Sequence, residues 1–304
     1  MIIIAKTILL YFFHFLLFSD FKTVIIAGGL SNKNCGLKTA ESIGFNAMSI
    51  DDLPTPNQGH CLVLTNTQTL LTFGGYRLLN KKCYEYQNNT WLYHSTMLKP
   101  RINSSAITMS DGVYVFGGTE FNYHKESEFL PNGSSTWQSG PKIPGLGVAA
   151  SSIVKVSEHE LVIIGGCYSP KQVLKYDTYS KTWTFLGNLN HERKQHSSAK
   201  LLDGNILITG GITNSSEVFN LSTMESRKTG WLREPRQDHG LSFVNFCSRP
   251  EMIVFGGIST YKHSYTHIDT IEKWNAKSWE VMPNLKLERR QFAYLTVPSY
   301  LLCP

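Results

Sequence analysis

Six Gly-Gly pairs recur along this chain of 304 residues at nearly constant spacing. The distance between first glycines ranges from 43 residues, between Gly74 and Gly117, to 48 residues, between Gly117 and Gly165. A period of this length, held from end to end, is typical of proteins built from stacked structural repeats. The pairs are Gly28-Gly29, Gly74-Gly75, Gly117-Gly118, Gly165-Gly166, Gly210-Gly211 and Gly256-Gly257.

A short apolar run, rich in Val, Ile and Phe, leads into each pair. Such a run predicts a strand that is buried on both faces. Glycine permits positive φ angles and close approach of the backbone, so each pair is expected to end its strand near a crowded axis. The runs read VIIAGG, LLTFGG, VYVFGG, LVIIGG, ILITGG and MIVFGG.

Two further signals recur in phase with the pairs. An aromatic strand and a Trp follow the last five pairs, and an Arg with a His or Ser three residues later precedes several of them. The first repeat has Phe45 and Met48 where a Trp is expected, and residues 144–148 contain neither Arg nor His. The Trp residues are Trp91, Trp137, Trp183, Trp231 and Trp279; the other in-phase residues are Arg101 with Ser104, Arg193 with His196, Arg236 with His239, and Asn57 with His60.

This order of strand, Gly-Gly, aromatic strand, Trp, turn and Arg resembles the kelch repeat over about residues 21–304. The resemblance implies an all-β, six-bladed β-propeller over residues 20–304, in which each repeat forms one four-stranded blade. Radial stacking buries the faces of each blade against its neighbours and leaves only short exposed edges.

The C-terminal segment predicts how the ring closes. Residues 292–297 open a repeat with an apolar strand, but no Gly-Gly pair follows them. We expect this strand to pair with residues 24–27 in a composite blade shared by the two ends of the chain. Without it, the first and last blades would expose long strand edges.

Residues 1–19 read as a secretory signal peptide, because Lys6 precedes an apolar run that ends at Ser19. Cleavage there would give a secreted propeller that is not bound to the membrane. The run is shorter than the roughly 20 apolar residues of a membrane span. An uncleaved anchor that includes residues 2–5, and a gene-model artefact ahead of a cytoplasmic protein, are the alternatives.

The asparagine and cysteine residues also bear on whether the protein is exported. The five Asn-x-Ser/Thr sequons are predicted glycosylation sites in loops or at strand ends, although chance occurrence is the alternative. The six cysteines allow up to three disulfides, and a bond from Cys303 to Cys247 or Cys35 would fasten the ring closure. Cys61 is expected to be a buried, reduced thiol. The sequons are Asn88, Asn103, Asn132, Asn214 and Asn220.

The sequence predicts neither catalysis nor a cofactor. It contains no nucleophile elbow, no phosphate-binding loop and no dinucleotide-binding motif, and its net charge of +6 is too diffuse for a nucleic-acid surface. His263 and His267 have metal-ligand spacing but lie in a loop without a partner fixed by spacing, so no metal site is expected. The in-phase residues are assigned to contacts between repeats: His60, His196, His239, Glu85, Glu128, Glu217, Glu272, Arg101, Arg193, Arg236 and Arg290.

One enzymatic alternative comes from the galactose oxidase-like copper enzymes, which the propeller also resembles. Those enzymes need a Tyr joined to a Cys. The adjacent pairs Cys83-Tyr84 and Cys167-Tyr168 do not suit such a bond, because successive side chains of a strand point to opposite faces.

The function expected from the resemblance is a monomeric, non-catalytic module that binds a protein partner through loops after the Gly-Gly pairs. The loop 259–267 is the longest, and ordinary loop packing is the alternative role for its aromatic residues. A substrate receptor of a cullin ubiquitin ligase, lacking its BTB and BACK regions, is the second interpretation, and actin binding is a third. The candidate binding residues are Tyr261, His263, Tyr265, His267, Tyr76, Arg77 and Tyr123.

Overall fold

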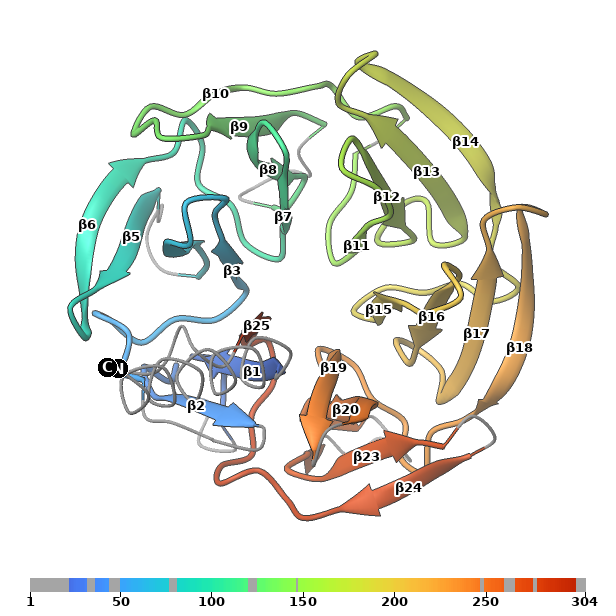
Figure 1. The fold of residues 1–304 in the computed structure, drawn as a ribbon. Coiled ribbons are helices and arrows are strands. Elements are labelled where there is room, and N and C mark those ends of the chain that lie inside the picture. Colours follow the sequence, from blue (N-terminus) through green and yellow to red (C-terminus); the bar gives the residue numbers. More distant parts are fainter. Residues whose placement is uncertain are drawn as a thin grey trace, which may run out of the picture.

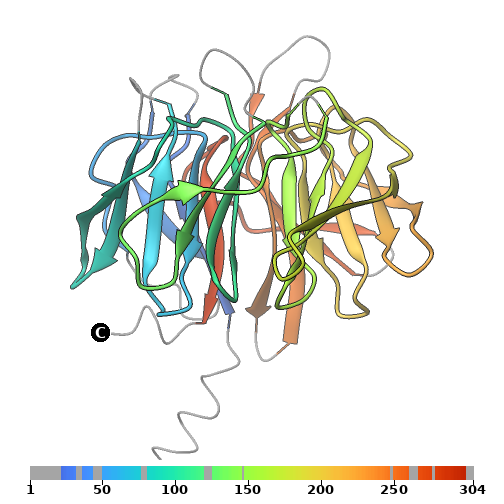
Figure 2. The ribbon, with the colours of Figure 1, turned by 90° about the horizontal axis from the view of Figure 1, so that it is seen from above.

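The computed structural model describes residues 22–31, 36–43, 50–76, 81–119, 125–145, 147–246, 249–259, 266–275 and 278–298. Within these residues the regular structure is entirely β, and six sheets surround a central axis as a six-bladed propeller (Figure 1). Figure 2 shows the disc from the side, with the blades standing around the axis. The predicted fold class is confirmed.

Blades are numbered here in the order of their Gly-Gly pairs, and their strands run outwards from the axis. Blade 1 holds β25 (Ala293–Pro298), β1 (Lys22–Ala27) and β2 (Ala40–Ile43). Blade 2 holds β3 (His60–Leu64), β4 (Leu70–Gly74), β5 (Lys82–Gln87) and β6 (Thr90–Thr96). Blade 3 holds β7 (Ser105–Met109), β8 (Gly112–Phe116), β9 (Ser127–Pro131) and β10 (Gln138–Ser139).

The second half of the ring repeats this order. Blade 4 holds β11 (Ser152–Lys155), β12 (Glu160–Ile164), β13 (Gln172–Asp177) and β14 (Thr182–Asn188). Blade 5 holds β15 (Ser197–Lys200), β16 (Ile206–Thr209), β17 (Ser215–Asn220) and β18 (Glu225–Trp231). Blade 6 holds β19 (Gly240–Phe246), β20 (Arg249–Phe255), β23 (Ile271–Trp274) and β24 (Trp279–Met282), and carries the small hairpin of β21 (Ile258–Ser259) and β22 (Thr266–His267).

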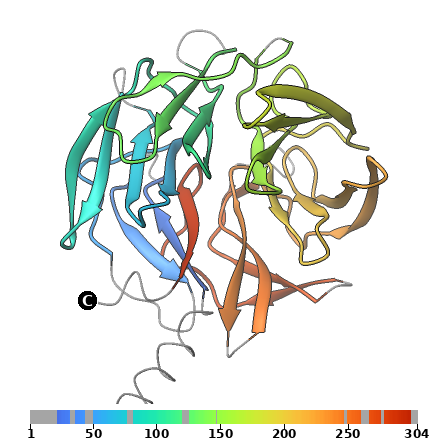
Figure 3. The ribbon, with the colours of Figure 1, turned by 45° about the horizontal axis from the view of Figure 1, so that its top comes forward.

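The ring closes through the predicted composite blade. β25 pairs antiparallel with β1, so that Thr296 lies opposite Val24 and Ala293 lies opposite Ala27. Figure 3 shows the red C-terminal strand beside the blue N-terminal strand. The orphan strand in the sequence therefore has the partner that was expected.

The Gly-Gly pairs end the second strand of each blade and join it to the next blade. Both glycines of a pair have positive φ, for example 74° at Gly74 and 96° at Gly75. A Cβ on Gly74 would lie 2.8 Å from the carbonyl oxygen of Arg101, so glycine is required for the close approach. The second glycine of each pair donates its N–H to a carbonyl of the following blade: Gly29 to Asn57, Gly75 to Arg101, Gly118 to Val148, Gly166 to Arg193, Gly211 to Arg236 and Gly257 to Arg289.

The core lies between neighbouring blades. The recurrence of Trp91, Trp137, Trp183 and Trp279 at one place in the repeat predicts that these large side chains are buried there. Trp91, Trp137 and Trp279 are buried in separate interblade clusters. Trp183 is only partly buried, and its ring packs 5.8 Å from that of Phe116 on the preceding blade. The expected burial is thus confirmed for three of these four residues.

Trp231 does not occupy the Trp position of the repeat. Trp91, Trp183 and Trp279 each lie opposite an aromatic residue of the neighbouring strand. The corresponding pair in blade 5 is Phe219 with Ser226, whereas Trp231 lies opposite Ser215 and is 60% exposed. Trp231 follows Phe219 by twelve residues, and this long spacing in the sequence could have shown that Trp231 falls outside the repeat pattern.

Candidate functional site

The antiparallel blades give the disc two chemically different ends. The Gly-Gly face carries the Gly-Gly pairs, the loops that follow them and the linkers that lead into each inner strand. The turn face carries the turns between first and second strands and between third and fourth strands. We use these two names below for the two ends.

A closed ring of backbone hydrogen bonds surrounds the axis at the Gly-Gly face. Each blade contributes one residue whose φ lies between 51° and 61°, in the left-handed region. The N–H of each residue donates to the carbonyl of the next, over 2.7 to 3.2 Å. The six residues, in donor order, are Gly59, Gln291, Asp238, Gln195, Ala150 and Asn103, which returns to Gly59.

This ring was not predicted from the sequence. Three of its members stand two residues after Arg101, Arg193 and Arg236. Their recurrence in phase with the repeat could therefore have been found by counting from the arginines. Gly59 and Asn103 are residue types that tolerate positive φ, but Ala150 is not. The conformation is therefore imposed by the contacts between blades.

Below the ring lies an axial channel of about 790 Å³ lined by the inner strands. Its hydroxyl groups bond between blades: Ser152 Oγ lies 2.8 Å from His196 Nε2, and Ser198 Oγ donates to Ser152 Oγ over 2.8 Å. Ser105 Oγ donates to the carbonyl of Ser151 over 2.8 Å. These polar side chains hold neighbouring inner strands together.

The in-phase histidines are buried and neutral at pH 7. Burial lowers the pKa of His60 to about 4 and is the main cause that lowers the pKa of His196 to about 3. Burial also puts the pKa of His239 well below its ordinary value, and Nε2 of that ring lies 3.0 Å from Thr209 Oγ1 of the preceding blade. The expected contacts between repeats are confirmed for His196 and His239.

Four blades contain a buried ion pair between the linker into the blade and its third strand. Arg101 Nε lies 3.0 Å from Glu128 Oε1, and Arg236 Nη2 lies 2.9 Å from Glu272 Oε1. The same glutamates accept backbone N–H groups of the linker, as Glu128 Oε2 does from Leu98 over 2.7 Å. The other two pairs are Arg193 with Glu217 and Arg289 with Glu41.

These pairs correct two sequence assignments. Arg289, not Arg290, lies in phase with the other arginines, because it stands four residues before the inner strand, as Arg193 does. Arg290 Nη1 instead lies 3.9 Å from the carboxylate of Asp238 in the ring. Glu85 has no such pair in the described residues. In its blade, Tyr84 lies opposite Thr72, at the position where the four blades with an ion pair have their glutamate.

The predicted binding residues are only partly within the described structure. Tyr76 is exposed directly after the second Gly-Gly pair, whereas His267 is buried in β22 and its pKa is lowered mainly by burial. The remaining candidates lie outside the described residues: Arg77, Tyr123, Tyr261, His263 and Tyr265.

The sequons and cysteines are distributed unevenly. Asn88 and Asn132 are exposed, Asn214 and Asn220 are partly buried, and Asn103 belongs to the axial ring. Cys61, Cys83 and Cys167 are unpaired thiols, and burial is the main cause that raises the pKa of Cys61 to about 11 and that of Cys83 to about 12. The proposed bond of Cys303 to Cys247 or Cys35, and the segment 1–19, lie outside the described residues.

Among the described residues, the large apolar side chains exposed on the Gly-Gly face include Leu98 in a linker and three residues in loops. Tyr76, Tyr168 and Ile212 are 62%, 57% and 52% exposed, and each stands one or two residues after a Gly-Gly pair. Of these three loop residues only Tyr76 is a candidate binding residue from the sequence, although the loops that hold the other two were expected to bind. Their common position after the pairs was the signal that could have found the other two.

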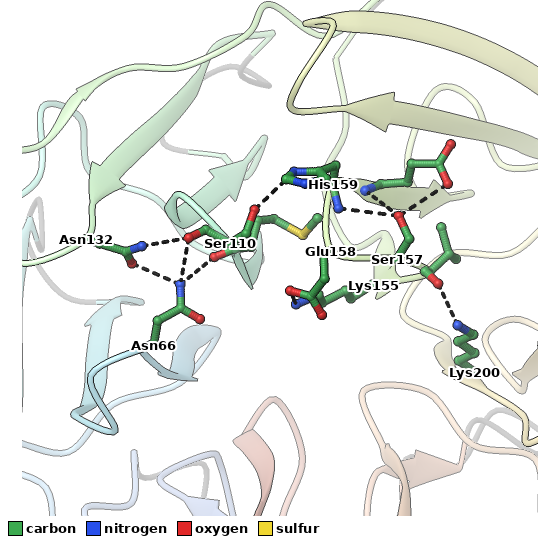
Figure 4. Close-up of polar contacts among 11 residues, drawn as sticks. Asn66, Ser110, Asn132, Lys155, Ser157, Glu158, His159 and Lys200 are labelled. Carbon is green, nitrogen blue, oxygen red and sulfur yellow. Dashed lines mark hydrogen bonds and ion pairs between the residues drawn. The ribbon is translucent and has the colours of Figure 1, made fainter.

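The turn face presents a polar network across blades 2 to 4 (Figure 4). Asn66 Nδ2 donates to Asn132 Oδ1 over 3.0 Å, and Asn132 Nδ2 donates to the carbonyl of Ser110 over 2.7 Å. Ser110 Oγ lies 3.1 Å from His159 Nδ1. These side chains stabilise the turns against one another.

Within the described residues, Cys83 and Tyr84 do not lie as the linked Cys and Tyr of a copper-radical site would. Cys83 packs in the cluster between blades 2 and 3, whereas Tyr84 packs in the cluster between blades 1 and 2, on the opposite face of β5. Among the described residues, no three His, Cys, Asp or Glu side chains are grouped to hold a metal ion. The same part of the chain contains no helix that could span a bilayer.

Comparison with known proteins gives relatives for most of the chain. It is 26% identical to Kelch-like protein 23 of Mus musculus and of Homo sapiens over 246 residues, which cover 74% of this chain and 41% of each relative. A shorter stretch of 71 residues is 39% identical to tRNA wybutosine-synthesizing protein 4 of Saccharomyces cerevisiae, covering 22% of this chain and 10% of that protein. The chain thus spans about two fifths of the length of Kelch-like protein 23. No protein-family model matches it.

Proposed function

Starting from the fact that this chain is a kelch-repeat β-propeller, we propose that it is a non-catalytic module that docks a protein partner on its Gly-Gly face. The observation that carries this proposal is the exposure of Tyr76, Tyr168 and Ile212 on three blades of that face. Exposed aromatic and large apolar side chains supply much of the binding energy at protein interfaces.

The use of the recurring polar groups supports a binding role over a catalytic one. The buried arginines and glutamates hold linkers, and His196 and His239 bond to neighbouring blades. An active site requires a nucleophile, acid or base that can reach substrate. In the described residues the Arg–Glu pairs make contacts within a blade, and the two histidines make contacts between blades.

We also propose export, followed by removal of residues 1–19 and glycosylation at the exposed Asn88 and Asn132. Mass spectrometry of protein from the medium of secreting cells tests this directly. A chain retained in the cytoplasm with its N-terminus intact would contradict export.

The second candidate is the receptor part of a cullin ubiquitin ligase. It follows from the resemblance of the repeats to those of kelch proteins, and the similarity to Kelch-like protein 23 over 246 residues supports that resemblance. This role would use the same face to hold its substrate. Retention in the cytoplasm, together with co-purification of a cullin, would select it over the secreted module.

Paired substitutions on opposite ends of the same blades test the docking face. The docking variant combines Tyr168→Ala with Ile212→Ala. Its control combines Tyr179→Ala with Leu202→Ala on the turns of the same two blades, where both side chains are 84% exposed. Both variants should keep the melting temperature of the wild type, since exposed side chains contribute little to stability.

Partner capture by cross-linking and mass spectrometry should then separate the two variants. We expect the docking variant to lose the cross-links made by the wild type and the control to keep them. Equal loss in both variants, or loss only in the control, would contradict a partner site on the Gly-Gly face. Replacing Tyr261 and Tyr265 by Ala in the same assay tests the loop 259–267.

A further inference from the structure

Blades 4 and 5 form one continuous surface at the Gly-Gly face. The loop 167–171 is fixed to the linker 189–194 by two backbone bonds, from Leu189 N to Lys171 O over 2.7 Å and from Arg193 N to Pro170 O over 2.8 Å. The linker in turn touches the next loop, because a Cβ on Gly211 would lie 2.9 Å from the carbonyl oxygen of Lys194. We call the loop 167–171, the linker 189–194 and the loop 211–214 the blade 4–5 surface.

Apolar side chains lie at the two ends of this surface, and cationic side chains lie between them. Tyr168 and Ile212 mark its two ends, and the exposed side chains of Lys171 and Lys194 belong to the segments between them. Lys228 of β18 adds a third exposed cation near its rim, where Asn190 Nδ2 donates to the carbonyl of Ser226 over 2.7 Å.

Two of these exposed cations, Lys228 and Lys171, act on His191 in the linker. Burial first, then the charges of Lys228, Arg193 and Lys171, lower the pKa of His191 in the linker, against an opposing effect of Glu217. Glu192 is the single carboxylate within the three segments that is exposed, and Arg193 is neutralised by Glu217. The surface therefore carries a net positive potential.

The turn face of the same blades has the opposite arrangement. There Lys155 Nζ lies 2.9 Å from Glu158 Oε2, and Lys175 Nζ lies 2.6 Å from Glu160 Oε1. No ion pair joins Lys171, Lys194 or Lys228 to another described residue. The blade 4–5 surface thus leaves its cations available to a partner, whereas Lys155 and Lys175 on the turn face are paired.

We propose that the blade 4–5 surface binds an acidic segment of the partner protein, whose carboxylates face Lys171 and Lys194 and whose apolar side chains cover Tyr168 and Ile212. This proposal rests on the docking function above and specifies the chemistry of the partner. Complementary charge at such a surface steers association and selects against basic partners, while the apolar contacts hold the complex.

A random peptide library displayed on phage, selected on the whole folded protein, tests the proposal without knowledge of the natural partner. We expect enrichment of peptides that combine Asp or Glu with large apolar residues. Synthetic peptides from the selection should bind less tightly as the salt concentration rises, because exposed charges are screened.

Charge reversal locates the site of these peptides. Lys171→Glu combined with Lys194→Glu should weaken their binding about tenfold or more, which corresponds to about 1.4 kcal/mol. The matched control is Lys181→Glu, an exposed residue at the other end of β13 in the same blade, which should leave binding unchanged. Circular dichroism of each variant verifies the fold.

The outcomes separate this proposal from the docking function. Selected peptides that need Tyr168 and Ile212 but carry no excess of acidic residues would overturn the charge proposal and leave the docking face intact. Peptides insensitive to both the apolar and the charge variants, or a selection that yields no binder while cross-linking still finds a protein partner, would overturn the proposed surface.

Discussion

Blades 4 and 5 solve the same packing problem with opposite chemistry. In blade 5, Arg193 and Glu217 form a fully buried ion pair at the junction of linker and third strand. In blade 4, Val148 and Leu174 stand at the corresponding positions and belong to one apolar cluster. Both blades keep their Gly-Gly pair and the same backbone bond to the following blade.

The comparison shows that the pair, rather than either residue, is the unit of the repeat. Two charges can be replaced together by two apolar side chains, whereas one charge left alone in the same place lacks its partner. Blade 2 gives an intermediate case, since Asn57 Nδ2 donates to the carbonyl of Gly74 over 2.9 Å as the arginines do to theirs. The backbone contacts between blades are common to all three arrangements.

The largest expected effect comes from breaking the ion pair on one side. Glu217→Leu leaves Arg193 buried without its counter-ion and leaves the backbone N–H of Asn190 without its acceptor. We expect a loss of about 3–5 kcal/mol in the free energy of unfolding, measured by denaturant titration. A loss below about 1 kcal/mol would mean that the pair is not a structural unit.

Making blade 5 resemble blade 4 should recover much of that loss. The double variant Arg193→Val with Glu217→Leu should unfold with a free energy about 2 kcal/mol or more above that of Glu217→Leu alone. The same titration measures this difference, with Arg193→Val completing the cycle. Additive effects of the two substitutions would contradict the paired exchange.

A smaller difference between the blades concerns His196, which blade 4 replaces by Ser151. The pKa of His196 is lowered to about 3, against about 6.5 in the unfolded chain, so the unfolded chain binds the proton first as the pH falls. Its contribution to stability is complete above pH about 6.5 and declines towards pH 3, reaching a loss of about 2 kcal/mol at pH 5. His196→Ser should flatten the pH dependence of the melting temperature over this window, and an unchanged slope would show that the ring is accessible to protons.

The smallest effects distinguish the two Trp residues of these blades. Trp183→Ala removes contacts with Phe116 and Tyr176 and should lower stability by about 1–3 kcal/mol. Trp231→Ala removes an exposed side chain outside the repeat position and should change stability by about 0.5 kcal/mol or less. Equal losses in the two variants would contradict the register assigned to blade 5.

The features set by local chemistry could be predicted from the sequence, and those set by contacts between blades could not. The Gly-Gly pairs and the orphan strand at 292–297 indicated both the blades and the closure. Arg289 was missed because two adjacent arginines give no local sign of which side chain turns inwards. The loops that contain Tyr168 and Ile212 were expected to bind, but the two residues were not singled out, because exposure depends on the surrounding linkers rather than on the residue.

The axial ring of six left-handed residues has an electrostatic consequence. Its N–H and C=O groups follow one another head to tail around a circle, so their dipoles cancel, unlike those aligned along a helix. The backbone therefore presents neither a positive nor a negative pole to the axis. The charge at this mouth is set by side chains alone, chiefly by Asp238 with Arg290 beside it. Substitution of either residue alone would leave the mouth with the charge of the other, while the circle of backbone bonds stays in place.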